Sequence, residues 1–464
     1  MATETGHDGG SGAEPATEAD LTYPAESLPG FFREHFGPSM LWALIGIGGS
    51  HILLAPIVAS VFGLFAVVIY LFLFAVRYGG WELGIRYAYG TGRNPLEGYR
   101  NLPGPSDWAL WVALANFTLI AAIIVASVGV TSAGFLAAFL ERAGIASVSP
   151  TAAHVGLVAL AAGFVGLSRY SLLEKVLTVF TVVIFALVVV GALVGPPSAR
   201  LVNETLLTVP DRPTEAWILL VVAAAGVTPA GFSNTVFIGS WMTAKEQGAG
   251  ELREQGLDPD DEAHHDYIRS WIATGKRDFR IGYAFSLLLL LAMVVLAANV
   301  IFPEPLTNEN FALAVGSVLS ESFGPGIFFV MVAGAFAAVY STVIALFDGA
   351  SRASSRILGM VLDRDLDGEW TRRAVVGLIA TGGLAPVVAL GPRTVDFALF
   401  ITVTLAVVEA FYFPANWYIT ETELPEALRP SNAWRVYYAV SLLVVAVFAA
   451  LALFRAGVLL GWLP

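Results

Sequence analysis

Eleven segments of this 464-residue chain are each about twenty or more residues long, apolar and almost free of charge. They cover residues 38–61, 63–87, 107–140, 150–167, 170–195, 214–243, 280–302, 325–350, 372–391, 394–419 and 433–461. A helix needs about 20 apolar residues to cross the hydrocarbon core of a bilayer. Only 13% of the residues are charged, against about 25% in a typical soluble domain. The pattern predicts an all-α, multi-pass protein of the cell membrane with about 11 transmembrane helices, and it excludes a soluble fold.

The distribution of Lys and Arg predicts the orientation of the chain. Most of the 25 basic residues follow the second, fourth, sixth, eighth and tenth spans. Short, positively charged loops stay in the cytoplasm, so we expect the N-terminus to be cytoplasmic and the C-terminus extracellular. Residues 1–36 hold seven acidic residues and one Arg and are rich in Gly, Ser and Pro. That composition predicts a disordered acidic cytoplasmic tail.

The net charge and the missing cysteines exclude several functions. A net charge of −12 argues against nucleic acid and against anionic lipid headgroups as partners. The chain has no cysteine, so it has no thiolate nucleophile or thiolate metal site. It also lacks a P-loop, a nucleophile elbow and a zinc-protease motif. We expect no enzyme activity and no cofactor, and as partners the lipid bilayer and a transported small ion or solute. The oligomeric state stays open.

Two of the spans are interrupted by residues that disfavour a helix. The first contains Gly-Ile-Gly-Gly-Ser-His at residues 46–51, and the sixth contains Gly-Val-Thr-Pro-Ala-Gly at residues 226–231. Glycine in membrane helices often serves only close packing. Equivalent interruptions five spans apart instead favour two inverted repeats with broken helices. Unwound backbone survives in a membrane only where it is buried or lines a cavity.

The predicted organisation follows from these breaks. We expect a first five-helix repeat at 37–196, an outer connection at 197–213 and a second five-helix repeat at 214–419. The second repeat includes an acidic cytoplasmic loop at 246–275, and residues 420–464 form an additional eleventh helix.

Polar residues beside the two interruptions are the candidate substrate ligands. His51 is ionisable and lies inside a predicted span, which by itself suggests function, although backbone groups freed at a break would also satisfy it. Ser233 and Asn234 could bind substrate or cap the second half of the sixth helix. The predicted substrate-binding residues are Gly48, Ser50, His51, Thr228, Ala230, Ser233 and Asn234.

A second set of polar residues lies deeper in the predicted bundle. Asn116 is in the third span, and Glu409 is in the tenth, where an unpaired carboxylate would be costly. With His51 they form a candidate coupling or polar network. Glu409 has an alternative role as one half of a buried ion pair with Arg77.

Two stretches resemble the natural resistance-associated macrophage protein (Nramp) family. Residues 37–100 share with it the opening Gly-Pro, the interrupted first helix and the run Arg-Tyr…Thr-Gly…Leu-Glu-Gly-Tyr-Arg. Residues 334–352, GAFAAVYSTVIALFDGASR, resemble helix 8 of a remote branch of the family. The resemblance implies a LeuT-type fold, with a 5+5 inverted repeat, broken helices 1 and 6 and one extra helix. It also implies secondary transport of a divalent metal ion.

The metal-binding motifs of the resembling family are replaced in this chain. Its Asp-Pro-Gly-Asn motif corresponds to residues 48–51, which are Gly-Gly-Ser-His, and its Met-Pro-His motif corresponds to residues 228–230, which are Thr-Pro-Ala. The carboxylate, the thioether and the helix 6 imidazole are therefore missing, and the third span lacks the acidic residues of the family's proton route. The remaining metal-ligand candidates are Ser50, His51, Thr228 and Asn234.

Three hypotheses of function follow. The first is a secondary active transporter that moves a cation, by family default a divalent metal ion. The second is a symporter of the same fold for a small organic solute such as an amino acid, whose carboxylate the glycine-rich helix 1 could bind. The third is a membrane sensor or scaffold that does not transport.

Overall fold

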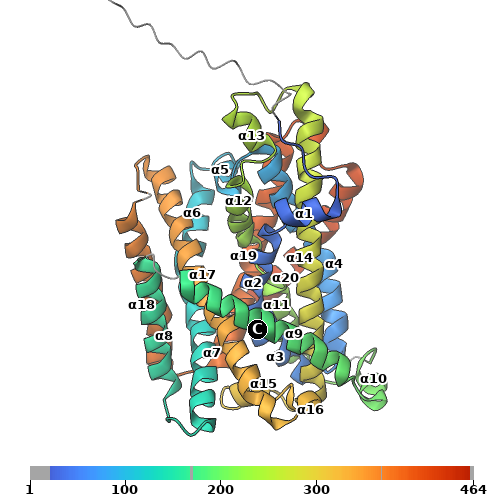
Figure 1. The fold of residues 1–464 in the computed structure, drawn as a ribbon, viewed down its shortest axis with the longest axis vertical. Coiled ribbons are helices and arrows are strands. Elements are labelled where there is room, and N and C mark those ends of the chain that lie inside the picture. Colours follow the sequence, from blue (N-terminus) through green and yellow to red (C-terminus); the bar gives the residue numbers. More distant parts are fainter. Residues whose placement is uncertain (1–20, 168–170, 209, 367, 460–464) are drawn as a thin grey trace, which may run out of the picture.

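The computed structural model describes residues 21–167, 171–208, 210–366 and 368–459, and within these ranges the regular structure is entirely helical. Figure 1 shows the long helices packed into one bundle. Among the described residues, eight helical segments are long and apolar enough to cross a membrane, or nine if a pair bent by 98° counts as one span. The prediction of an all-α membrane protein is confirmed.

Each of the eleven predicted spans has a helical counterpart in the structure. In chain order they are α2, η2 and α3 (Pro38–Gly46, Ile47–Leu54, Ala55–Phe62), α4 (Phe65–Thr91), α6, η3 and α7 (Trp108–Ala115, Asn116–Ile120, Ala121–Arg142), α8 (Pro150–Gly166), α9 (Ser171–Val194), α11 and α12 (Thr214–Val227, Thr235–Thr243), α14 (His265–Val300), α17 (Phe328–Leu362), α18 (Glu369–Leu390), α19 (Thr394–Glu423) and α20 (Asn432–Leu459). Their number as complete crossings stays a prediction.

Short helices cover the two ends of the bundle. At one end lie α1 (Leu28–Glu34), α5 (Pro95–Tyr99) and α13 (Ala249–Glu254), and at the other lie α10 (Ala199–Thr205), α15 (Phe311–Gly316) and α16 (Ser320–Phe323) (Figure 1). The bent pair consists of Thr181–Val194 of α9 followed by α10.

Small residues bring the long helices into close contact. A Cβ added to Gly226 of α11 would collide with the carbonyl oxygen of Thr402 on α19, and one added to Gly282 of α14 would lie 2.7 Å from the Cβ of Ser39 on α2. Glycine at such positions lets backbones approach, which is how helices associate in a membrane without a hydrophobic driving force.

The segment before the first long helix is folded where the structure describes it. Ser27 caps α1 by accepting a hydrogen bond from Gly30 N, and the segment is held down by hydrogen bonds from Trp271 Nε1 to Thr22 O and from Thr22 N to Glu251. Residues 21–36 are therefore folded in the structure, unlike the disordered tail predicted for 1–36, because Phe31 and His35 are buried and hydrogen bonds to α13 and α14 hold the segment. Residues 1–20 lie outside the described residues.

We call α2, η2 and α3 together helix 1, and α11 with α12 helix 6. The predicted break is present in helix 6 and absent from helix 1. Helix 6 stops at Val227, Thr228 is extended (φ −91°, ψ 127°), and α12 begins at Thr235. Helix 1 instead continues through a π-helix at Ile47–Leu54, where Ala55 N donates to Ser50 O. The wider turn keeps the backbone groups paired inside the membrane, so the glycines do not force unwinding. π-Helical turns are rare and often mark functional sites.

Candidate functional site

The π-helical turn of helix 1 contacts the break of helix 6 directly. Ser50 Oγ lies 2.7 Å from Pro229 O and 2.8 Å from Gly46 O. A Cβ added to Gly46 would lie only 2.8 Å from Pro229 O, so glycine is what permits this approach. Residues 179 positions apart in the chain thus meet at a fully buried hydroxyl.

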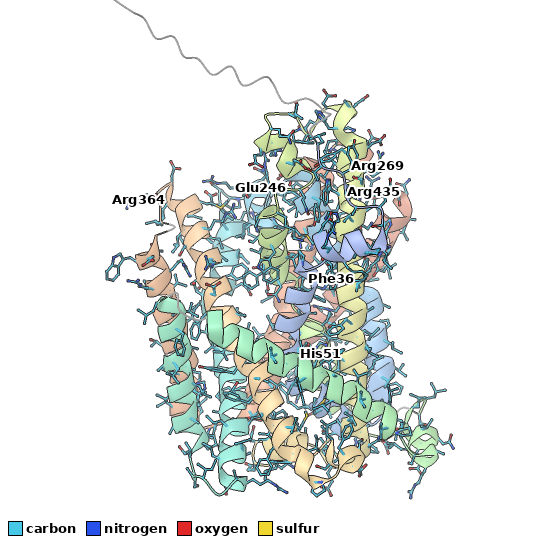
Figure 2. The ribbon with its side chains drawn as sticks, viewed as in Figure 1. Phe36, His51, Glu246, Arg269, Arg364 and Arg435 are labelled. Carbon is cyan, nitrogen blue, oxygen red and sulfur yellow. The ribbon has the colours of Figure 1, made fainter. Side chains whose placement is uncertain are left out.

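His51 extends this contact to a third helix. Its Nδ1 lies 2.7 Å from Ser50 Oγ, and its Nε2 lies 2.8 Å from Ser286 O and 3.0 Å from Ser286 Oγ on α14. Figure 2 shows His51 between the two ends of the bundle. The three residues form a buried polar cluster, which we call the His51 cluster: Ser50, His51 and Ser286.

The hydrogen bonds of the His51 cluster depend on the protonation of His51. Ser286 O can only accept, so Nε2 carries the ring proton of neutral His51 and Nδ1 is then an acceptor. Ser50 must give its single proton to Nδ1, and none is left for Pro229 O. When both ring nitrogens are protonated, Nδ1–H donates to Ser50 Oγ, and the hydroxyl proton is free to bond with Pro229 O or with Gly46 O. Protonation of His51 therefore frees the Ser50 proton for a backbone carbonyl, and Pro229 O of helix 6 is the nearer acceptor, at 2.7 Å against 2.8 Å for Gly46 O.

A buried ion pair between Arg77 and Glu409 binds backbone groups at the break of helix 6. Arg77 of α4 donates to the carbonyl oxygens of Ala225 and Ala230, and its Nη2 lies 3.1 Å from Glu409 Oε2 of α19. Glu409 also accepts hydrogen bonds from Phe232 N, at 2.9 and 2.8 Å to its two carboxylate oxygens. The pair thus satisfies backbone groups that the interrupted helix leaves free. The predicted alternative role of Glu409, pairing with Arg77, is the one the structure shows.

Helix 8, which is α17, occupies the space beside Gly48. A Cβ added to Gly48 would collide with Thr342 Oγ1 and would lie 2.9 Å from Ala338 O. The position at which the resembling family carries its metal-binding Asp therefore has no room here for a side chain. Gly49 differs, because a Cβ there would meet nothing within 4 Å.

Of the other predicted residues, Thr228, Ser233 and Asn234 lie at the break of helix 6, and Asn116 lies elsewhere. Thr228 is fully buried, and its Oγ1 has no hydrogen-bond partner within the described part of the chain. Ser233 and Asn234 lie in the 3-10 turn Phe232–Asn234, and Asn234 does not cap α12 through its side chain. Asn116 lies in a second π-helical turn, Asn116–Ile120. Among the described residues no hydrogen bond joins it to His51 or Glu409.

Metal-ligating side chains do not converge in the structure. Within the four described ranges, no three His, Asp or Glu residues form a group that could hold a metal ion. Any cation at the helix 1 and helix 6 contact would therefore meet hydroxyl and carbonyl oxygens and one imidazole.

Sequence reasoning missed Ser286 and Thr342. Ser286 was detectable as the one polar side chain in the apolar run AFSLLLLLAMVVLAA at residues 284–298. Nothing in the sequence alone pairs it with His51, because the two are 235 positions apart.

The fold and the site define the class to which this protein belongs. An all-helical bundle in which a broken helix 6 meets helix 1 at a buried polar cluster is typical of secondary transporters, whose binding sites lie at interrupted helices. The sequence profile described as natural resistance-associated macrophage protein-like matches residues 62–455. The chain belongs to the Nramp family.

Two solved structures share this fold, and one further protein is similar in sequence. A manganese transporter of Eremococcus coleocola, crystallised as a mutant, has a TM-score of 0.66 at 12% sequence identity, covering 95% of this chain and 90% of that one. The structure of MhsT in complex with L-phenylalanine gives a TM-score of 0.55 at 14% identity, covering 89% and 98%. An uncharacterized protein of Pasteurella multocida (strain Pm70) is 22% identical over 361 residues, or 75% of this chain and 76% of that protein. At these identities the solved structures establish the fold.

Proposed function

We propose that this chain is a secondary active transporter of the Nramp type, which moves a metal ion across the cell membrane by alternating access around helices 1 and 6. The observation that carries the proposal is the direct contact of Ser50 with Pro229, at 2.7 Å, between the π-helical turn and the break. Family membership and the fold shared with a manganese transporter support a metal ion as the substrate.

The ligands for the ion come from both interrupted helices. Ser50, His51, Thr228 and Asn234 supply oxygens and one imidazole; imidazole suits iron, and carbonyl oxygens and water suit manganese. Thr228 Oγ1 is buried and has no partner within the described residues, so it is available to bind an ion. Because no carboxylate takes part, the ion keeps part of its hydration shell during transport.

His51 is the proton-coupling group of this mechanism. Its protonated form leaves the Ser50 proton free to bridge helices 1 and 6 at Pro229 O, in competition with Gly46 O, and its neutral form takes that proton on Nδ1. A metal ion that binds the imidazole needs it neutral. Ion binding and the bridge therefore compete for His51, which links movement of the ion to release of a proton.

The hypothesis of an organic solute lacks the feature on which it depended. It required free N–H groups at residues 46–49 to bind a carboxylate. The π-helical turn uses the backbone groups of Ile47–Leu54 in its own hydrogen bonds. A sensor or scaffold is distinguished from a transporter by the uptake experiment below.

The proposed orientation places the N-terminus in the cytoplasm and the C-terminus outside the cell. α1, α5 and α13 lie together at one end of the bundle, as expected for segments on the cytoplasmic side (Figure 1). The proposed inverted repeats are residues 37–196 and 214–419, followed by an added helix within 420–464.

The test is uptake by proteoliposomes that contain the purified full-length chain. Manganese, iron and magnesium are offered separately, alongside a set of amino acids, with and without a proton gradient. We expect saturable uptake of manganese or iron that His51→Ala abolishes, while His154→Gln, in α8 and away from the site, leaves uptake near the wild-type rate. Amino-acid uptake without metal uptake, or no uptake of any kind, contradicts the proposal.

A further inference from the structure

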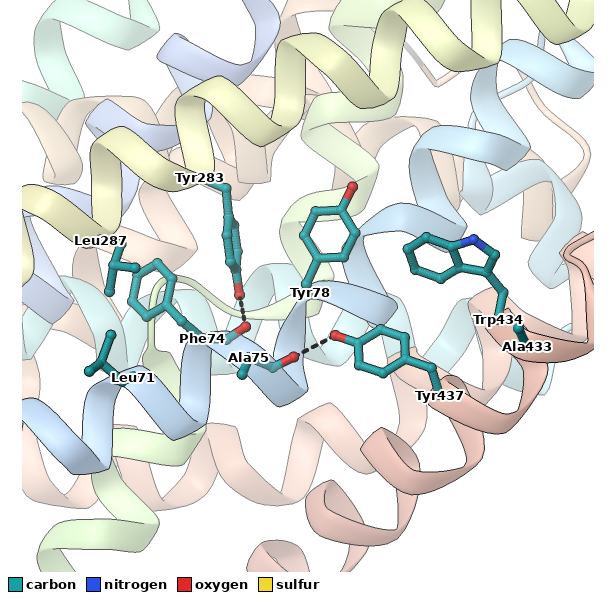
Figure 3. Close-up of a pocket in the computed structure, with 9 residues that line it drawn as sticks. All are labelled: Leu71, Phe74, Ala75, Tyr78, Tyr283, Leu287, Ala433, Trp434 and Tyr437. Atoms are coloured by element: carbon teal, nitrogen blue, oxygen red, sulfur yellow. Dashed lines mark hydrogen bonds between the residues drawn. The ribbon is translucent and has the colours of Figure 1, made fainter.

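A groove lined by aromatic side chains opens on the surface of the bundle between α4, α14 and α20 (Figure 3). Its volume is about 640 Å³, within the range of sites that bind small molecules. The lining residues are Leu71, Phe74, Ala75, Tyr78, Tyr283, Leu287, Ala433, Trp434 and Tyr437. The groove lies on the outside of the bundle and shares no residue with the His51 cluster.

The walls of the groove are fixed and largely apolar. Tyr283 OH donates to Phe74 O at 2.8 Å, and Tyr437 OH donates to Ala75 O, as the dashed lines in Figure 3 show. Both hydroxyls are therefore satisfied by backbone, and their rings form the surface that an occupant meets. Such a surface suits a hydrocarbon chain.

Basic residues stand at one end of the groove. The apolar part of α14 begins after Arg280, and its twenty residues at 281–300 match the thickness of the hydrocarbon core. Lys276 and Arg280 therefore lie at the membrane boundary, one to two turns before Tyr283. Trp434, near the start of α20, lies at the same level, because Lys276 Nζ is 4.6 Å from its ring centroid. This is the zone that Trp and Tyr prefer in membrane proteins.

Of the two basic residues at this end of the groove, Arg280 is the one that can bind an anion. Lys276 is paired with Glu82. Arg280 is exposed and donates through Nε to Tyr78 OH at 3.1 Å, and it forms no ion pair with any described residue. Its remaining N–H groups suit a phosphate, which arginine binds with paired hydrogen bonds.

We propose that this groove binds one anionic phospholipid from the leaflet at the α1 and α13 end, with an acyl chain along the aromatic walls and its phosphate at Arg280. Basic pockets between membrane helices on the cytoplasmic side recognise lipid headgroups in this way. The net charge of −12 argues against anionic lipids in general, but at this end of the groove Arg86, Lys276 and Arg280 lie around the carboxylate of Glu82, so the local charge is positive. Phosphatidylcholine carries the same phosphate beside a cationic choline, so the net negative charge of the headgroup decides the preference at Arg280. The proposal is independent of the transported substrate.

The test is native mass spectrometry of the delipidated full-length protein, titrated with phosphatidylglycerol or phosphatidylcholine of identical acyl chains. We expect one phosphatidylglycerol to bind about fivefold more tightly than phosphatidylcholine, since one Arg near the surface contributes about that factor. Arg280→Gln, at an exposed position that tolerates change, removes the preference. Ala75→Phe, which fills the groove, weakens binding of both lipids.

Matched controls separate this site from ordinary contact with lipid. Arg393→Gln, at an exposed arginine between α18 and α19, keeps the preference. Glycerol phosphate without acyl chains does not displace the lipid. Equal affinity for both lipids with no effect of Arg280→Gln, displacement by glycerol phosphate alone, or dimers that Ala75→Phe abolishes would each overturn the proposal.

Discussion

Arg77 and Glu409 form a buried ion pair whose hydrogen bonds all go to one another or to the backbone around the helix 6 break. The guanidinium also lies 4.4 Å from the ring centroid of Phe232. Two charges from helices α4 and α19 thus hold carbonyl and amide groups that the interruption leaves without helical partners. The break is stabilised by side chains that lie far from it in the sequence.

Removing one member of this pair destabilises the protein more than removing both. Glu409→Leu leaves Arg77 charged and buried, which costs about 3–5 kcal/mol, whereas Arg77→Met with Glu409→Leu removes the unpaired charge. We expect a lower apparent unfolding temperature in detergent for Glu409→Leu than for the double variant. An equal or larger loss in the double variant would show that the backbone contacts, rather than the charges, dominate.

The two interruptions show what the sequence could and could not predict. Helix 6 was predictable because Pro229 lacks an N–H group and Gly231 follows closely, so a continuous helix was disfavoured. Helix 1 was not, because Gly48 and Gly49 are compatible with both an unwound segment and a π-helical turn. Packing against helix 8 and Pro229 O decides between these states, and that packing is long-range. The candidate residues were predicted from the same sequence signal as the interruptions, and Ser286, which contacts His51, was not predicted.

Adjacent glycines in the π-helical turn respond differently to a methyl group. A Cβ at residue 48 meets backbone atoms of Ala338 and Val339, which cannot rotate away, whereas a Cβ at residue 49 meets open space. We expect Gly48→Ala to destabilise the protein by about 1–3 kcal/mol, as overpacking does, and Gly49→Ala to have little effect. Apparent unfolding temperatures of the two variants, measured together, check this. Equal shifts would mean that helix 8 does not press on Gly48.

The folded segment before helix 1 weakens at acidic pH. His35 Nε2 accepts a hydrogen bond from Ala25 N at 2.8 Å, which requires the neutral ring, and Lys245 Nζ donates to His35 O nearby. Burial lowers the pKa of His35 below its usual value of 6.5, against an opposing effect of Glu34. The stabilisation is therefore complete above about pH 6.5 and is lost as the pH falls from there through the lowered pKa.

Hydrogen exchange at residues 21–36 measures this effect. We expect faster exchange at pH 5.5 than at pH 7.5, after correction for intrinsic rates, and a smaller difference in His35→Gln. A pH effect of the same size in that variant would assign it to another group.

Substitution of Thr228 distinguishes an effect on ion binding from an effect on the stability of the fold. Its hydroxyl is buried and has no partner within the described residues, so Thr228→Val removes an unsatisfied polar group, which is neutral or stabilising. If the hydroxyl binds the ion, the same change removes a hydrogen bond or ligand to a charged group, and the ion concentration for half-maximal uptake rises about tenfold or more. Thr228→Ser keeps the oxygen and serves as the matched control. Uptake in proteoliposomes and unfolding temperature are measured on the same preparations. Normal uptake by Thr228→Val would exclude this hydroxyl from the binding site, and a large loss of stability would show that it has a structural partner.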